Sequence, residues 1–208
     1  MSGKRDTNAG WITWLQWILL TTLGWLAAMG LSTLLPANLH TFLSPIAMIF
    51  LVFVTLAWAA GIAALQWLAL RRYFSGAVKW ILASSAGMLI GSVVAMPLKL
   101  RDWYIGPSGF QLDEVAYGFV FGILLGAAQW LALRTWVHNS GWWIVSNTVG
   151  WTLGMTVGEL LPLNWNSTCA SFVYTMVTEI IPTAVIGVAL VMLLRNPLHR
   201  ASVMKNTG

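Results

Sequence analysis

Glu179 is the residue of this chain whose type and position are most suggestive of chemistry. It lies about nine residues inside a long apolar stretch, and if that stretch spans a bilayer, a carboxylate near its middle costs about 2.5–3.5 kcal/mol. Pro182 follows three residues later and frees the carbonyl of Thr178 from helical hydrogen bonding. The pair predicts a site that binds a cation, relays a proton or holds a cationic ligand. The alternative is a protonated Glu179 that hydrogen-bonds to a neighbouring helix.

Glu159 is the second candidate, because it lies near the end of another apolar stretch, three residues before Pro162. We expect it toward the outer mouth of a pathway that involves Glu179. Asp113 and Glu114 open a further apolar stretch, where carboxylates stabilise the positive end of a helix. That pair is interpreted as helix capping.

Polar residues also recur inside the apolar stretches. Gln66 and Gln129 each precede an arginine by five residues, while Thr21, Ser84 and Asn147 each follow a tryptophan by four. Helix rise predicts that Gln66 lies level with Ser84 and Gln129 level with Asn147. They either form hydrogen bonds between helices, worth about 0.6 kcal/mol each, or line a cavity as a polar ring.

Other chemistry finds little support. The single cysteine, Cys169, excludes a CxxC redox or zinc motif, and three widely separated histidines have no metal-ligand spacing. We find no nucleophile–base pair, so we predict no catalytic residues and no metal site. The sequence does not identify a cofactor.

The composition places these residues in a membrane. The chain is 58% hydrophobic and 8% charged, with a mean hydropathy of +0.75, whereas a soluble domain carries roughly 25% charged residues. Six apolar stretches are long enough to cross a bilayer as helices. They cover about residues 12–35, 46–71, 79–97, 114–136, 142–162 and 170–195.

A repeat with a period of 63 residues relates these stretches. Trp17, Trp80 and Trp143 are spaced by this interval, and a glycine follows each of them by seven residues. Small residues at four-residue spacing let helices approach closely in lipid. The glycines that we expect to serve helix packing in this way are Gly24, Gly87, Gly91, Gly150 and Gly154.

The repeat predicts an all-α integral membrane protein of six transmembrane helices, arranged as three hairpins. Three hairpins with the same sense fit around a pseudo-threefold axis along the membrane normal, as parallel repeats do in some transporters. The prediction places residues 1–208 in one membrane domain, with a cytoplasmic tail at 196–208. The first span carries part of the repeat, so we expect it to be retained rather than removed as a signal peptide.

The basic residues predict the orientation. Nine of the eleven Lys and Arg fall on one side of the spans, and only Lys99 and Arg101 fall on the other. By the positive-inside rule, both termini are cytoplasmic in a bacterial inner membrane. The basic residues are scattered over short segments, which argues against nucleic-acid binding. The expected partners are the lipid bilayer and a second copy or a membrane complex.

Two near-identical segments, QWLALR at 66–71 and at 129–134, precede Trp-Ile helices. In this the chain resembles uncharacterised bacterial multi-pass membrane proteins with repeated QWLxLR segments. The likeness covers the second to fifth spans and implies no activity.

Two functions follow as expectations. The first is a small transporter or channel-like protein whose pathway involves Glu179. The second is a non-transporting protein that binds a lipid-soluble cofactor or assists a membrane complex. The deep tryptophans Trp25, Trp58 and Trp151 bear on this choice, since they either pack against glycines or stack on a planar ligand. An integral-membrane enzyme is a third, weaker alternative.

Overall fold

Six long helices make up the fold in a computed structural model that describes residues 7–32, 45–73, 76–99, 104–105, 110–161 and 168–195. In chain order they are α1 (Thr7–Ser32), α2 (Pro45–Leu70), α3 (Ala77–Lys99), α4 (Leu112–Leu133), α5 (Trp142–Leu160) and α6 (Thr168–Leu194). The all-helical class and the six helices predicted from the apolar stretches are thereby confirmed. The tail at 196–208 lies outside the described residues.

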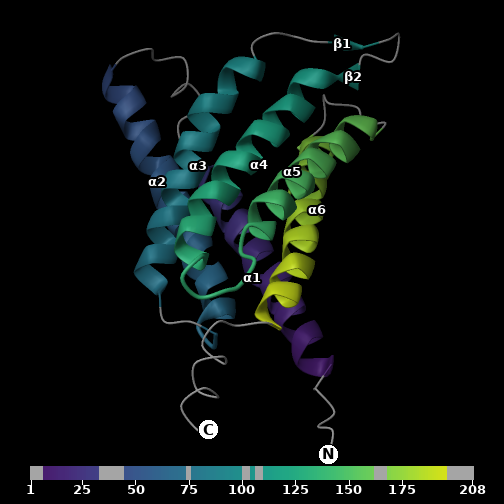
Figure 1. Cartoon of the computed structure of the whole chain (residues 1–208). Helices are drawn as coiled ribbons and strands as arrows, with labels where there is room; N and C mark the ends of the chain where they lie inside the picture. The colour runs from purple at the N-terminus through teal and green to yellow at the C-terminus, as the bar shows by residue number, and fades with distance from the viewer. Residues whose placement is uncertain are drawn as a thin grey trace, which may run out of the picture.

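A two-stranded antiparallel ribbon was not predicted. It joins β1 (Tyr104–Ile105) to β2 (Phe110–Gln111), directly before α4. In Figure 1 it lies at the top of the bundle, while α1 begins and α6 ends at the bottom. We call the bottom the terminal end and the opposite side the ribbon end.

Five of the six helices are long and apolar enough to cross a membrane: α1, α2, α3, α4 and α6. Their outward surfaces are rich in exposed leucine, valine, isoleucine and phenylalanine, which lipid tails solvate and water does not. α5 is shorter and more polar, because Ser146, Asn147, Thr148, Thr152 and Thr156 interrupt its apolar sequence. The hydroxyls of the three threonines donate to backbone carbonyls of α5 itself, so these three groups are satisfied within the helix.

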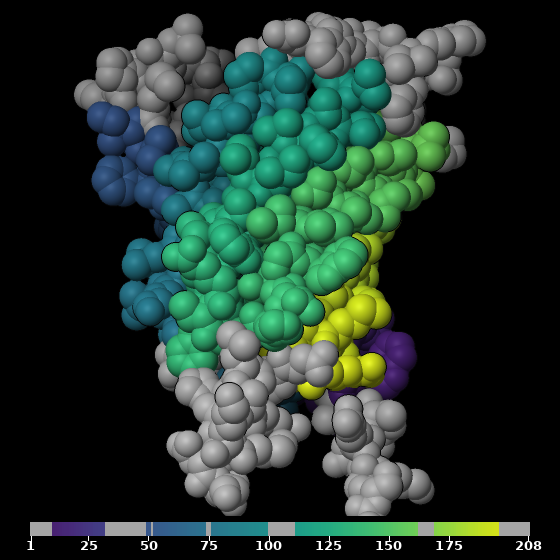
Figure 2. Space-filling model, in the orientation of Figure 1, coloured from purple at the N-terminus to yellow at the C-terminus, as the bar shows by residue number. Residues whose placement is uncertain are grey.

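The helices form a closed ring. Each helix packs against the next one along the chain, and α6 returns to pack against α1. Figure 1 shows the antiparallel succession of α3, α4, α5 and α6, and Figure 2 shows the continuous surface that α3, α4 and α5 make on one side. The core lies inside this ring and includes the three largest fully buried side chains, Trp17, Trp80 and Trp143.

The prolines of α2 and α3 lie at opposite ends of their helices. Pro97 lies inside α3, which continues to Lys99. The position is exposed and within the last turn, so the proline removes one hydrogen bond where the helix is about to end. Pro36 and Pro162 lie outside the described residues. Pro45 begins α2, as expected for a proline in the first helical turn.

Candidate functional site at the centre of the ring

Three indole rings form a closed layer across the bundle near the terminal end. Trp17 of α1, Trp80 of α3 and Trp143 of α5 are each at most 1% exposed. Their ring centroids are 5.7–6.1 Å apart, and every pair meets edge to face. This geometry suits aromatic quadrupoles. These tryptophans therefore point into the core and not toward the headgroups.

A polar layer lies one helical turn beyond the indoles. Gln129 of α4 donates from Nε2 to the Ser84 hydroxyl at 3.0 Å and accepts the indole N–H of Trp143 on Oε1 at 2.9 Å. The expected partner of Gln129 was Asn147, whose amide instead donates to the Trp143 carbonyl of its own helix. The prediction thus gave Gln129 the wrong partner. Its side chain bonds to Ser84 of α3, in the same hairpin, and to Trp143 of α5.

A cavity of about 20 Å³ lies on the ribbon side of the indole layer. All six helices contribute to its wall. The lining side chains are Trp17, Thr21, Trp25, Gln66, Met88, Leu125, Gln129, Asn147, Trp151, Pro182, Thr183 and Ile186. Four of the five polar residues singled out from the sequence therefore meet at one place, although their positions are up to 126 residues apart. Ser84 reaches the cavity wall through its bond to Gln129.

Glu179 lies on the same buried face of α6 as the cavity-lining Pro182, Thr183 and Ile186. Four residues separate it from Thr183, which places it about 6 Å nearer the ribbon end. The side chain is 7% exposed, and its Oε2 has no hydrogen-bond partner among the described residues. A buried carboxyl in this condition is costly, which is the observation that makes it a functional candidate.

Tyr117 of α4 lies within electrostatic reach of Glu179. The Ser92 side chain of α3 lies within hydrogen-bonding reach of the Tyr117 hydroxyl. Lys99 lies 4.3 Å above the Tyr117 ring and forms a 2.7 Å ion pair with Glu114. Polar side chains therefore follow one another from the ribbon end to the indole layer. We call this series, Lys99, Glu114, Tyr117, Glu179, Thr183 and the polar cavity wall, the polar column.

Glu159 stands beside the polar column and not in it. Its Oε1 accepts a hydrogen bond from the Tyr174 hydroxyl at 3.2 Å, between α5 and α6. The side chain is partly buried near the ribbon end, within electrostatic reach of Asp113 and Glu114. The N-cap residue of α4, Gln111, makes no side-chain capping bond, and Asp113 and Glu114 occupy the first turn, where carboxylates stabilise the positive end of the helix dipole.

Pro182 shapes the contact between α5 and α6. A Cβ added at Gly154 would lie 2.8 Å from the Thr178 carbonyl oxygen, and one at Gly150 would lie 3.0 Å from Cα of Pro182. The carbonyl that the proline frees therefore faces the backbone of α5. Only glycine permits this approach, and the freed carbonyl is thereby enclosed by protein.

The other glycines singled out from the sequence also lie at tight contacts. An added Cβ would come 3.1 Å from Cα of Ile62 at Gly24 and 3.2 Å from Cα of Leu125 at Gly87. In both hairpins the contacted residue follows the glycine by 38 positions. At Gly91 it would come 2.9 Å from the Phe121 ring. Close backbone packing of this kind is what holds helices together in lipid.

The deep tryptophans pack against other rings. Trp151 meets Phe121 edge to face at 4.6 Å and Trp25 at 6.2 Å. Trp25 and Trp58 are partly buried against the core. These contacts favour the packing interpretation of the deep tryptophans over ligand stacking.

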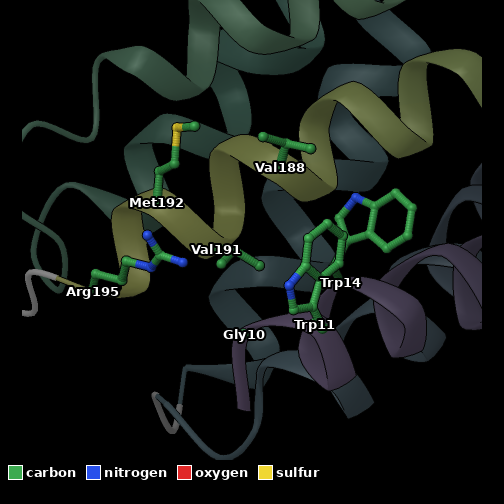
Figure 3. Close-up of a pocket in the computed structure, with 7 residues that line it drawn as sticks. All are labelled: Gly10, Trp11, Trp14, Val188, Val191, Met192 and Arg195. Carbon is green, nitrogen blue, oxygen red and sulfur yellow. The ribbon is translucent and has the colours of Figure 1, made fainter. Parts of the chain in front are cut away.

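Two apolar grooves flank the last two turns of α6 on the outside of the ring. The larger, about 490 Å³, lies between α5 and α6 and is edged by His138, Asn139 and Trp142. The smaller, about 190 Å³, lies between α1 and α6 (Figure 3), where Val188, Val191, Met192 and Arg195 line the α6 side. Trp11 and Trp14 close its other side, and the Trp14 indole donates to the Ala184 carbonyl at 3.1 Å.

Within the described part of the chain, no three His, Cys, Asp or Glu side chains come close enough to hold a metal ion. Sequence reasoning missed Tyr117 and Thr183. Both depart from the 63-residue repeat, since the positions equivalent to Tyr117 and Thr183 in the other copies are apolar, and that departure was a signal that could have found them.

Comparison with known proteins adds no identity. No family model, no curated protein and no solved structure matches this chain.

Proposed function

We propose that this chain is a small transporter or channel-like protein of the bacterial inner membrane, with Glu179 on its pathway. The observation that carries the proposal is the polar column, in which a buried carboxyl stands between an ion pair at one end and a polar cavity at the other. Side chains of this kind inside an otherwise apolar bundle are typical of ion and proton routes. Glu159, beside the ribbon end of the column, would then lie near the outer mouth.

Three further points belong to this proposal. α5 crosses the membrane with the other helices, because α4 and α6 both pack against it. The three hairpins are related by a pseudo-threefold axis, a relation supported by the mutual contacts of Trp17, Trp80 and Trp143. The terminal end, where Arg71, Arg72, Arg134 and Arg195 gather, faces the cytoplasm. In the state described, the indole layer closes the column on that side.

Proton flux into liposomes tests the pathway. Protein is reconstituted with a pH-sensitive dye inside, and a potassium gradient with valinomycin drives proton entry. We expect flux above that of empty liposomes for the wild type and its loss in Glu179→Gln, which keeps the shape of the side chain and removes its proton exchange. Glu159→Gln is the matched control, and it should slow the flux without abolishing it.

Two results would overturn this pathway. One is a wild-type flux equal to that of empty liposomes. The other is an unaltered flux in Glu179→Gln, provided that the variant elutes and melts like the wild type and is therefore folded.

The groove between α5 and α6 supports a second candidate function. The groove between α5 and α6 has a volume of about 490 Å³, within the 300–1,000 Å³ range of ligand pockets. It supports a non-transporting protein that binds a lipid-soluble molecule. Native mass spectrometry of the purified protein would then show a stoichiometric adduct that Val149→Trp, which fills the groove, removes. An apo mass under mild conditions would count against this function, and the same spectrum reports the oligomeric state.

A further inference from the structure

The side chains that line the central cavity carry several buried polar atoms without a hydrogen-bond partner among the described residues. Among the described residues, no hydrogen-bond partner exists for the indole N–H of Trp17, the Thr21 hydroxyl, Oε1 of Gln66, Oδ1 of Asn147 or the indole N–H of Trp151. All five side chains are at least 94% buried, and all five line the same cavity. Unsatisfied groups are costly one by one, so their convergence on one cavity calls for a common partner.

The size of the cavity limits that partner to about one water molecule. Its volume is about 20 Å³, and a cavity needs on the order of 10–15 Å³ by this measure to hold a water. A water in such a place needs two to four polar neighbours. Five of the side chains that line this cavity carry one such unsatisfied polar atom each.

The chemistry of the lining selects a neutral molecule. None of the twelve side chains that line the cavity is charged. The two indole N–H groups can only donate, which disfavours a cation, and the two amide oxygens can only accept, which disfavours an anion. The Thr21 hydroxyl can do either. A molecule that donates and accepts at once satisfies the whole set.

We propose that the central cavity is a binding site for one ordered water molecule, held between Trp17 of α1, Gln66 of α2, and Asn147 and Trp151 of α5, with Thr21 beside it. This site goes beyond the proposed function, because the water is bound whether or not the chain transports anything. It joins helices of the first and third hairpins through their polar groups, as buried waters commonly do.

The variant Thr21→Val distinguishes a water-filled cavity from an empty one by the direction in which it shifts the melting temperature. If the water is present, the variant loses a hydrogen bond to it, and the melting temperature of the purified protein should fall by about 2–4 °C. If the cavity is dry, the same change removes an unsatisfied hydroxyl, and the melting temperature should stay or rise. The matched control is Thr152→Val, whose hydroxyl donates to the Thr148 carbonyl of its own helix at 2.7 Å.

Water-to-indole magnetisation transfer by NMR tests the wild type directly, so the inference stays testable if Thr21→Val fails to fold. We expect cross-peaks from water to the Nε1–H signals of Trp17 and Trp151, assigned by single Trp→Phe variants. The Trp143 indole, which donates to Gln129, should show none and serves as the internal control. The inference is overturned if Trp17 and Trp151 lack cross-peaks, or if Thr21→Val is as stable as the wild type or more so.

Discussion

Trp17, Trp80 and Trp143 show how a single residue type, placed three times at one interval, builds the centre of this molecule. Each ring contacts the other two, so removing any one leaves a large hole bordered by two unsupported rings. Lipid cannot fill this hole, because the layer is enclosed by the ring of helices. Close packing of side chains matters especially in a bilayer, where no hydrophobic force drives the helices together.

Trp80→Ala should therefore destabilise the protein by on the order of 3–5 kcal/mol, the range for large aromatic truncations in cores. Trp142→Ala is the matched control, because Trp142 is 64% exposed on the outside of the bundle. Reversible unfolding in mixed micelles measures the free energy of unfolding of both variants. An equal loss of stability in Trp80→Ala and Trp142→Ala would contradict the buried indole layer.

Gln129 bonds to two different helices, and a double-mutant cycle can isolate one of these bonds. Gln129→Leu and Ser84→Ala each remove one partner of the 3.0 Å bond between α4 and α3. We expect a coupling of about 0.6 kcal/mol, the average for such bonds in a membrane protein. Coupling of Gln129 with Asn147→Leu should be near zero. A larger coupling energy for Gln129 with Asn147 than for Gln129 with Ser84 would instead support the Gln129–Asn147 bond expected from the sequence.

α5 and α6 are held together by a contact that only glycine allows. Gly154→Ala would place a methyl group 2.8 Å from the Thr178 carbonyl oxygen and from Cδ of Pro182, neither of which can move independently of its helix. We expect a loss of about 1–3 kcal/mol from this overpacking. In Gly61→Ala the added methyl meets nothing within 4 Å, and higher helix propensity should leave that variant at least as stable. The unfolding midpoints of the two variants, compared with the wild type, check the prediction.

The helices themselves were predictable, and their mutual arrangement was less so. Long apolar stretches and the 63-residue interval were enough to predict six helices and to select residues such as Gln66, Asn147 and Gly154 that meet inside. The interval could not show which way Trp17 points, because α1 is apolar on every side and carries no stripe that marks its buried face. Tyr117 was missed for a related reason. It lies on another helix, within electrostatic reach of Glu179, and the sequence of neither helix shows which helices pack together.

The ring of helices closes between the first helix and the last, and this closure is the property on which the enclosed centre depends. Without it, the central cavity and Glu179 would open toward lipid between α1 and α6. The contact is close at two places. A Cβ added at Gly10 would lie 3.1 Å from Cγ1 of Val191, and the Trp14 indole donates to the Ala184 carbonyl.

A designed disulfide tests the closure in the intact chain. In a Cys169→Ser background, Gly10→Cys with Val191→Cys brings two thiols to a separation compatible with a bond. Mild oxidation should link them within one chain, giving a faster-migrating band on a non-reducing gel that reductant reverses. Gly61→Cys with Val191→Cys is the control and should stay unlinked, since Gly61 lies on the exposed face of α2. A link formed only between chains would mean that α1 packs on the α6 of a second copy. No link at all would mean that the ring is open, and the enclosure of Glu179 would then lose its physical basis.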